Sequence, residues 1–265
     1  MGITLLKKEA KSVLRGNWIN AVIAALLLLF SFLIIQNMCW VLSLVVGDIA
    51  ASLVMLILTV LICGPLMLGV LRYFWRMAGK LSEAPATAFY YFSGVAAYRK
   101  AIRICVVLVI RLLGFALLFS LPAIVVYVIS SHELYELLQI PIPIWSQHLA
   151  YLVNSLLNIG AVLTAFALMR FYLAPILVIA DDRMDAEEAI HMSAVIARAS
   201  FLDFIFLVFS LAFWIILSVL FIPLIFTLPY FMMCYTLHAA HSIKEYNEKI
   251  KKLNDESFPS FVAGI

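Results

Sequence analysis

Long apolar stretches constrain this chain more than any other feature of its sequence. A helix needs about 20 mostly apolar residues to cross the roughly 30 Å of hydrocarbon in a bilayer. Backbone polar groups find no water there, so only helices and closed barrels can cross it, and barrel strands would give short alternating segments. We therefore predict an all-α, polytopic membrane helix bundle with six transmembrane helices and short interfacial amphipathic helices. The predicted spans are residues 18–35, 49–71, 104–128, 151–173, 204–226 and 230–241.

The composition agrees with a hydrocarbon environment. Hydrophobic residues make up 66% of the 265 residues and charged residues 12%, whereas a soluble domain averages about 45–50% and about 25%. Too few polar side chains are present to cover a water-soluble globule. We expect a single integral membrane domain over residues 1–265, with a cytoplasmic basic segment at 1–16, the six-helix bundle at 17–241 and a cytoplasmic tail at 242–265.

The distribution of lysine and arginine orients this bundle. Cytoplasmic loops carry an excess of these residues. They occur in the N-terminal segment, the second and fourth connections and the C-terminal tail, whereas residues 37–48 and 130–150 contain none. This alternation predicts six spans with both termini in the cytoplasm. Only three residues that end in Pro229 separate the last two runs, so these runs form either a full hairpin or a re-entrant pair.

The N-terminal segment has the pattern of an amphipathic helix. Its basic residues Lys7, Lys11 and Arg15 follow at i, i+4 and i+8. Its apolar side is formed by Leu6, Ala10, Val13 and Leu14. Such a helix is expected to lie on the inner leaflet of the membrane, where anionic lipid attracts the basic side chains.

The second and fourth connections resemble each other. Arg72 and Arg170 each stand beside aromatic residues at the end of a predicted span, and each connection continues into a short helix-compatible stretch. Asp185, followed by Glu188 three residues later, gives the second stretch a start like a capping box. The pattern suggests that spans two and three repeat as spans four and five. Parallel repeats occur in some transporters and also in bundles with no transport role.

Three arginines are candidates for an anion or lipid-headgroup site, or for structural contacts. Arg111 lies in the third span, eight residues or about 12 Å past Arg103 along a helix. An unpaired arginine at mid-membrane costs from about 2.5–3.5 to over ~10 kcal/mol, so Arg111 must snorkel, pair or line a wet cavity. Arg72 and Arg170 lie near the inner boundary. Their possible partners are Asp181, Asp182, Glu187 and Glu188.

A polar face on the fourth span is the other candidate site. Asn154, Ser155 and Asn158 follow at i, i+1 and i+4. Interhelical hydrogen bonds are the expected use of such residues in a membrane, and a solute path is the alternative.

Metal and catalytic chemistry find little support in the sequence. His238, His241 and Glu245 share a helix face and are types that bind metals, but no other span supplies matching ligands. We therefore expect a polar helix cap, no metal site and no cofactor. The common phosphate-loop, nucleophile-elbow, zinc-protease and dinucleotide motifs do not occur, so no catalytic residues are predicted. Nucleic-acid binding is implausible because the basic residues follow a membrane surface.

Several short motifs resemble those of a known family. They are Leu14-Arg15-Gly16-Asn17-Trp18, Cys63-Gly64-Pro65-Leu66 with Gly69, Leu121-Pro122-Ala123-Ile124, Ala180-Asp181-Asp182 with Ala186-Glu187-Glu188-Ala189-Ile190, and Leu228-Pro229-Tyr230. In this order they cover most of the chain and resemble a bacterial membrane-protein family, common in Firmicutes, that is defined by domain of unknown function nine-seven-five. The chain departs from the family pattern at Ala123, where glycine is usual. The resemblance implies a six-helix fold in the bacterial cytoplasmic membrane and supplies no reaction, substrate or active-site residues.

Two functions from different classes follow from these features. The first is a non-enzymatic structural or accessory protein that engages the lipid bilayer, anionic lipid or a membrane protein partner through its cytoplasmic face. The alternative is a small-solute or lipid transporter or channel with a path near Arg111. A lipid-modifying enzyme is a third hypothesis, and it lacks a nucleophile and an acid–base pair in the sequence.

Overall fold

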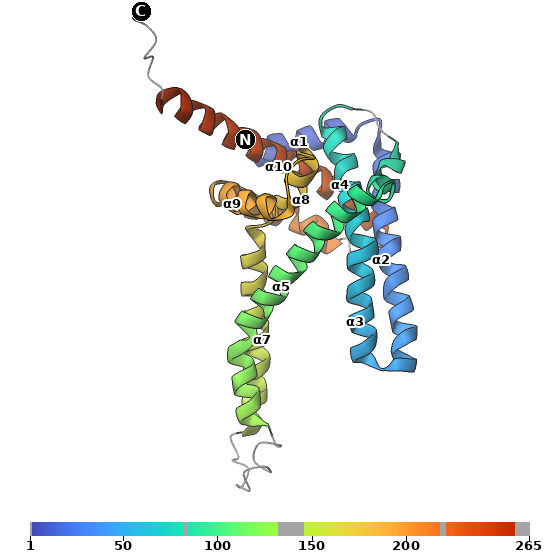
Figure 1. Ribbon diagram of the computed structural model, residues 1–265, viewed down its shortest axis with the longest axis vertical. Coiled ribbons are helices and arrows are strands. Elements are labelled where there is room, and N and C mark those ends of the chain that lie inside the picture. The colour runs from blue at the N-terminus through green and yellow to red at the C-terminus, as the bar shows by residue number, and fades with distance from the viewer. Residues whose placement is uncertain (1, 82–83, 132–145, 218–220, 258–265) are drawn as a thin grey trace, which may run out of the picture. The chain divides into compact units, whose positions relative to one another are not determined.

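A computed structural model describes residues 2–81, 84–131, 146–217 and 221–257, and every element in these ranges is helical. The predicted all-α class is thus confirmed. The chain forms two compact units, residues 1–105 with 171–265 and residues 106–170 (Figure 1). The elements are α1 (Ile3–Leu14), α2 (Trp18–Val46), α3 (Asp48–Leu58), the π-helical turn η1 (Thr59–Cys63), α4 (Gly64–Ala78), the 3-10 helix η2 (Pro85–Phe92), α5 (Val95–Ser130), α7 (Ser146–Met169), α8 (Ala174–Ala180), α9 (Ala186–Leu217) and α10 (Phe221–Ser257).

Five helical segments of the described residues are long and apolar enough to cross a membrane. They are Trp18–Val46, Asp48–Ala78, Val95–Ser130, Tyr151–Ala180 and Ala186–Ala212. Such a set is typical of a multi-pass membrane protein. The sixth predicted span, residues 230–241, lies within the 37-residue α10, which continues into the charged tail. Most of the predicted outer loop, residues 132–145, lies outside the described residues.

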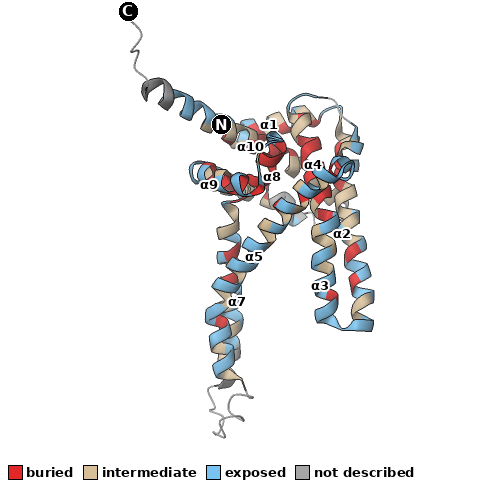
Figure 2. Ribbon diagram, in the orientation of Figure 1, coloured by how far each residue is buried: buried red, intermediate tan, exposed pale blue. Residues whose placement is uncertain are grey.

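Helices α2 and α3 form an antiparallel hairpin in the first unit, and they run side by side in Figure 1. Gly47 joins them with a φ of 86°, a conformation that L side chains rarely adopt. Near the middle of the hairpin, Ile35 and Cys39 of α2 pack against Cys63 of η1. Much of the remaining hairpin surface is apolar and exposed (Figure 2), as expected for helices that face hydrocarbon.

The second crossing helix changes its hydrogen bonding at η1. In a regular helix the N–H of residue 65 would bond the carbonyl of Leu61, but residue 65 is a proline and has no N–H. The hydroxyl of Tyr98, at the start of α5, donates to this carbonyl at 3.0 Å. A side chain from another helix therefore satisfies the group that Pro65 leaves unpaired.

Helix α4 and η2 approach so closely that their backbones are in contact. A Cβ atom built on Gly69 of α4 would lie 1.8 Å from the carbonyl oxygen of Ala88 in η2. Ala88 and Tyr91 are fully buried at this contact. The close approach therefore requires glycine at position 69, and it fixes η2 against α4.

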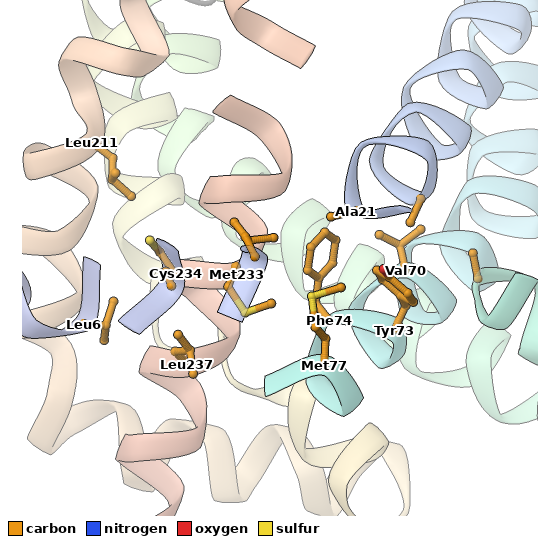
Figure 3. Packing of buried hydrophobic residues seen from close by; sticks show 14 of the residues in the cluster. Leu6, Ala21, Val70, Tyr73, Phe74, Met77, Leu211, Met233, Cys234 and Leu237 are labelled. Atoms are coloured by element: carbon orange, nitrogen blue, oxygen red, sulfur yellow. The ribbon is translucent and has the colours of Figure 1, made fainter. Parts of the chain in front are cut away.

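A hydrophobic core joins α1, α2, α4, α9 and α10 within the first unit. Figure 3 shows Leu6 from α1, Phe74 from α4 and Leu211 from α9 with Met233 and Leu237 from α10. The residues come from both ends of the chain, so this core is complete only when the whole chain is present. Buried residues are correspondingly frequent in α4 and α8 and sparse along α3 (Figure 2).

The structure shows what covers the apolar side of the N-terminal helix, α1. Leu6, Ala10 and Leu14 are buried in this core and do not face lipid. The Lys7 ammonium donates to the carbonyl oxygen of Ser210 in α9 at 2.7 Å and also to the Ser210 hydroxyl. The amphipathic pattern was read correctly, but protein covers the apolar face. A buried apolar surface is equally stabilised by lipid or by protein, so the pattern alone cannot distinguish the two.

The second unit is a hairpin of α5 and α7. At its closest point a Cβ atom on Gly160 of α7 would lie 2.8 Å from the carbonyl oxygen of Phe119 in α5. Thr164, one turn further along α7, is buried and bonds the carbonyl of Gly160. An apolar groove runs along the hairpin, and its lining includes Gly114 and Leu117 of α5 with Ala161 and Ala165 of α7.

Candidate functional site

Arg72 is the centre of a charged network in the first unit. It lies on α4, and its side chain is only 9% exposed. The guanidinium carbon lies 3.8 Å from the centroid of the Tyr90 ring, a cation–π arrangement. Its Nη1 donates to Oδ1 of Asp182 at 3.3 Å. The structure therefore pairs Arg72 with one of the four acidic residues that the sequence offered.

Lys100 connects the start of α5 to the end of α8. Its ammonium group donates to the carbonyl oxygens of Val178, Asp181 and Asp182 at 3.2, 3.1 and 2.8 Å. The last carbonyls of a helix have no partner within the helix and carry partial negative charge. Lys100 therefore caps α8 from outside. Sequence analysis missed this role, because the type and spacing of a lysine at a span boundary give no sign of it.

Arg103 adds a second bridge to the same loop. Its Nη1 donates to Oδ1 of Asp185 at 2.8 Å. This hydrogen bond, together with the backbone N–H of Ala186, lowers the pKa of the Asp185 carboxyl below its ordinary value. The predicted capping-box residue thus serves mainly as an ion-pair partner. Arg72, Lys100 and Arg103 together tie the second connection to the fourth.

Tyr91 completes the surroundings of Arg72. It is almost fully buried, and burial raises the pKa of its phenol, so the group stays neutral at physiological pH. The adjacent Tyr90 presents its ring face to the guanidinium and packs edge-on against Tyr91 at 5.2 Å between ring centroids. The site holds one arginine between aromatic residues and a carboxylate, an arrangement suited to fixing helices.

Arg170 and Arg72 lie in different environments, although the repeat pattern treats them as equivalent. Arg170 is exposed at the end of α7, whereas Arg72 is buried. Tyr172, two positions after Arg170, belongs to a separate polar cluster. Its hydroxyl lies 2.9 Å from the Ser200 hydroxyl and 3.0 Å from Nε2 of His238. The two connections therefore use their arginine–aromatic motifs differently.

Arg111 lies on the exposed surface of the second unit, in α5. Within the described residues it makes no hydrogen bond or ion pair. It precedes Tyr127, an aromatic residue of the type that gathers at membrane interfaces, by 16 positions, or about 24 Å of helix. With Tyr127 at one interface, hydrocarbon about 30 Å thick would place Arg111 about 6 Å from the opposite boundary. The side chain can reach the headgroups from there by snorkelling.

The polar face of the fourth predicted span is on α7. Asn154, Ser155 and Asn158 are all exposed. The Ser155 hydroxyl donates to the carbonyl oxygen of Tyr151 in its own helix at 2.9 Å. In the part of the chain that the structure describes, neither asparagine side chain has a hydrogen-bond partner. The three residues therefore differ, and only the two asparagines offer free polar groups.

His238, His241 and Glu245 on one face of α10 contact different partners. His238 contacts Tyr172, whereas Nε2 of His241 lies 3.4 Å from Oε2 of Glu9 in α1. Glu245 pairs with Lys249 one turn later at 2.8 Å, which lowers the pKa of its carboxyl. Among the described residues, no group of three or more His, Cys, Asp or Glu side chains could hold a metal ion.

These contacts support a structural use of several charged residues. Arg72, Lys100 and Arg103 connect helices, and Lys7 and His241 hold α1 in place. Comparison of the chain with family models, with curated proteins and with solved structures found no match. Other charged residues are exposed, among them Lys8 and Lys11 of α1 and Arg15 directly after it.

Proposed function

We propose that this chain is a non-enzymatic structural or accessory protein of the bacterial cytoplasmic membrane, which engages anionic lipid at its cytoplasmic face. The resemblance of its short motifs to the bacterial membrane family with domain of unknown function nine-seven-five supports the bacterial part of this proposal. One observation supports the binding of anionic lipid most directly. The apolar side of α1 is anchored in protein, while Lys8, Lys11 and Arg15 are exposed. Helix α1 and the residue directly after it therefore present three cations outward.

The physical basis is the negative surface of the inner leaflet. Each lysine or arginine near such a surface contributes about 1 kcal/mol of attraction. The packed core fixes α1 through Leu6 and Leu14, so these cations need not be ordered on binding. A fixed set of cations next to a membrane suits the selective retention of anionic headgroups.

The proposed topology keeps both termini in the cytoplasm. The six-span arrangement predicted from the sequence and a four-span arrangement with a re-entrant α9–α10 pair both satisfy the lysine and arginine distribution. The second is supported by the ring pair of Trp18, at the start of α2, and Phe226, near the start of α10, whose centroids lie 6.2 Å apart. A full hairpin would separate these rings by the thickness of the membrane.

Native mass spectrometry in a mild detergent tests the lipid proposal. The protein is incubated with equal amounts of phosphatidylglycerol and phosphatidylcholine, and bound lipids are counted. The variant Lys8→Gln/Lys11→Gln/Arg15→Gln should retain phosphatidylglycerol several-fold less than the wild type. The matched control Lys244→Gln/Lys251→Gln/Lys252→Gln removes the same charge from the exposed side of the α10 extension. Equal losses in both variants, or no preference in the wild type, would contradict the proposal.

The transport alternative lacks a comparable observation. The groove of the α5–α7 hairpin is lined almost entirely by apolar residues, and among the described residues Arg111, Asn154 and Asn158 are not part of its lining. A partner membrane protein remains compatible with the accessory role. It would appear in the same mass spectra as a bound species of protein mass.

A further inference from the structure

One of two unpaired carboxamides on α7 lies at a depth where water is scarce. Asn158 follows Tyr151 by seven residues and precedes Arg170 by twelve, which corresponds to about 10 Å and about 18 Å along the helix. Both ends of this stretch are typical interfacial positions, so Asn158 lies within the hydrocarbon. Asn154 is one turn nearer to Tyr151. Both side chains are exposed, and an unsatisfied carboxamide in hydrocarbon is costly.

The asparagines belong to a continuous stripe of small and polar residues. Positions 154, 158, 161 and 165 are spaced by four, three and four, the spacing of one helix face. The last two are Ala161 and Ala165, both exposed. Small residues allow two helix backbones to approach closely in a membrane. The stripe is thus polar at one end, and its alanine side chains are small enough to allow a second helix to approach closely.

The other faces of α7 have different characters. Gly160 and Thr164 face α5 and are buried. Ile159, Leu163 and Phe166 are bulky and exposed on a third side, which is typical of contact with lipid chains. The groove of the hairpin adjoins the stripe, because Ala161 and Ala165 also line the groove. The stripe is therefore a helix-packing face that α5 leaves uncovered.

We propose that α7 packs along this stripe against α7 of a second copy of the chain, with Asn154 and Asn158 hydrogen-bonded across the interface. A carboxamide has both donors and acceptors, so it is complementary to itself across a two-fold axis, the commonest symmetry of protein dimers. Lipid chains offer no hydrogen-bond partner, and anionic headgroups would call for a cation. The inference is independent of the lipid proposal for α1, which concerns the first unit.

Self-association in a membrane tests this proposal. The protein, labelled for fluorescence energy transfer, is reconstituted into vesicles of phosphatidylcholine and phosphatidylglycerol at decreasing protein-to-lipid ratios. The variant Asn154→Leu/Asn158→Leu should dimerise roughly tenfold less tightly than the wild type. Ser155→Ala is the matched control, because the Ser155 hydroxyl bonds its own helix, and it should dimerise like the wild type. Asn158→Gln keeps a carboxamide and should restore part of the affinity.

Oxidative cross-linking in the otherwise wild-type chain gives an independent test that needs no loss of the asparagines. Ala161→Cys lies on the stripe and should form a disulfide between copies, whereas Leu163→Cys on the bulky side should not. The wild type with its four cysteines gives the background. A monomeric wild type, equal dimerisation of the double leucine variant, or faster cross-linking at position 163 than at 161 would overturn the proposal. A lipid or a different protein bound in place of the second copy would overturn it as well.

Discussion

The aromatic rings of Trp18 and Phe226 lie 6.2 Å apart between centroids. Trp18 is the first residue of α2 and follows the basic N-terminal segment, whereas Phe226 lies near the start of α10. In a full transmembrane hairpin the start of α10 would be on the opposite side of the membrane from Trp18. The ring contact therefore supports a re-entrant α9–α10 pair. The contact of Lys7 with Ser210 supports the same arrangement, because it brings α1 against α9 well past the start of the fifth predicted span.

The first prediction concerns the four-span topology, in which α9 and α10 form a re-entrant pair. Phe226→Cys should react with a membrane-impermeant maleimide in inverted vesicles and not in right-side-out vesicles, as should the marker Lys8→Cys. Val46→Cys, at the α2–α3 turn, should show the reverse pattern. The wild type provides the background of its native cysteines. Labelling of Phe226→Cys together with Val46→Cys would favour the six-span hairpin instead.

The second prediction concerns the buried arginine. Asp182→Asn removes the charge partner of Arg72 and should lower the free energy of unfolding by about 1–2 kcal/mol, less than for a fully buried pair because the Asp182 side chain is 66% exposed. Arg72→Leu removes the buried charge itself and should be within about 1 kcal/mol of the wild type. Thermal unfolding in detergent measures both, at about 2–4 °C for each kcal/mol. A larger loss for Arg72→Leu than for Asp182→Asn would show that the contact of Arg72 with the Tyr90 ring outweighs the cost of burying its charge.

The third prediction concerns the carbonyl of Leu61. Tyr98→Phe leaves this oxygen without its donor and should cost about 1 kcal/mol. Pro65→Ala restores an N–H that can bond the same oxygen. In that background Tyr98→Phe should cost less, by about 0.5 kcal/mol or more in a double-mutant cycle. Strictly additive effects would mean that the hydroxyl does not compensate for the proline.

The fourth prediction concerns the contact of α4 with η2. Gly69→Ala would place a Cβ atom 1.8 Å from a backbone oxygen, and neither backbone can move without disturbing buried residues. We expect a loss above about 4 kcal/mol, seen as failure to purify folded protein. Gly114→Ala is the control, because a Cβ atom there meets nothing within 4 Å; it should be neutral or stabilise by up to about 1 kcal/mol. Normal folding of Gly69→Ala would contradict the observed backbone contact.

The fifth prediction concerns pH. Arg103 lowers the pKa of Asp185 in the folded state, so the stabilisation from this pair is present above the ordinary value of 3.8 and is lost as the pH falls through the lower folded value. The difference in thermal midpoint between wild type and Asp185→Asn should therefore be constant from neutral pH to about pH 4 and shrink in stronger acid. A difference that changes between pH 6 and pH 8 would point to another group.

The helical class and most helix positions could be predicted from the sequence, because apolar length and charge are local properties. The amphipathic pattern of α1 was equally clear. Its burial was missed because Leu6 meets partners more than 200 residues away in the chain, as the 203-residue separation of Lys7 and Ser210 illustrates. The α9–α10 topology was left open because four and six spans place the same lysines on the same side.

In the candidate sites, too, local features could be predicted and contacts between distant residues could not. Arg72 was noticed because a charge beside an apolar run is unusual, and its pairing with Asp182 was among the options that the sequence offered. Lys100 was missed because its partners are backbone carbonyls of α8, which no side-chain pattern reveals. The different environments of Arg72 and Arg170 could not be foreseen either, because a repeated motif records similar sequence and not similar surroundings.

The bond between His241 and Glu9 spans 232 residues of the chain, and this has a consequence for biosynthesis. At about 5–20 residues per second, a ribosome needs roughly 12–46 s between the two residues. Throughout this interval the apolar side of the first helix lacks its contacts with α10. During synthesis this side must therefore pack against the bilayer or an insertion factor. Helix α10 replaces that transient contact at the end of synthesis.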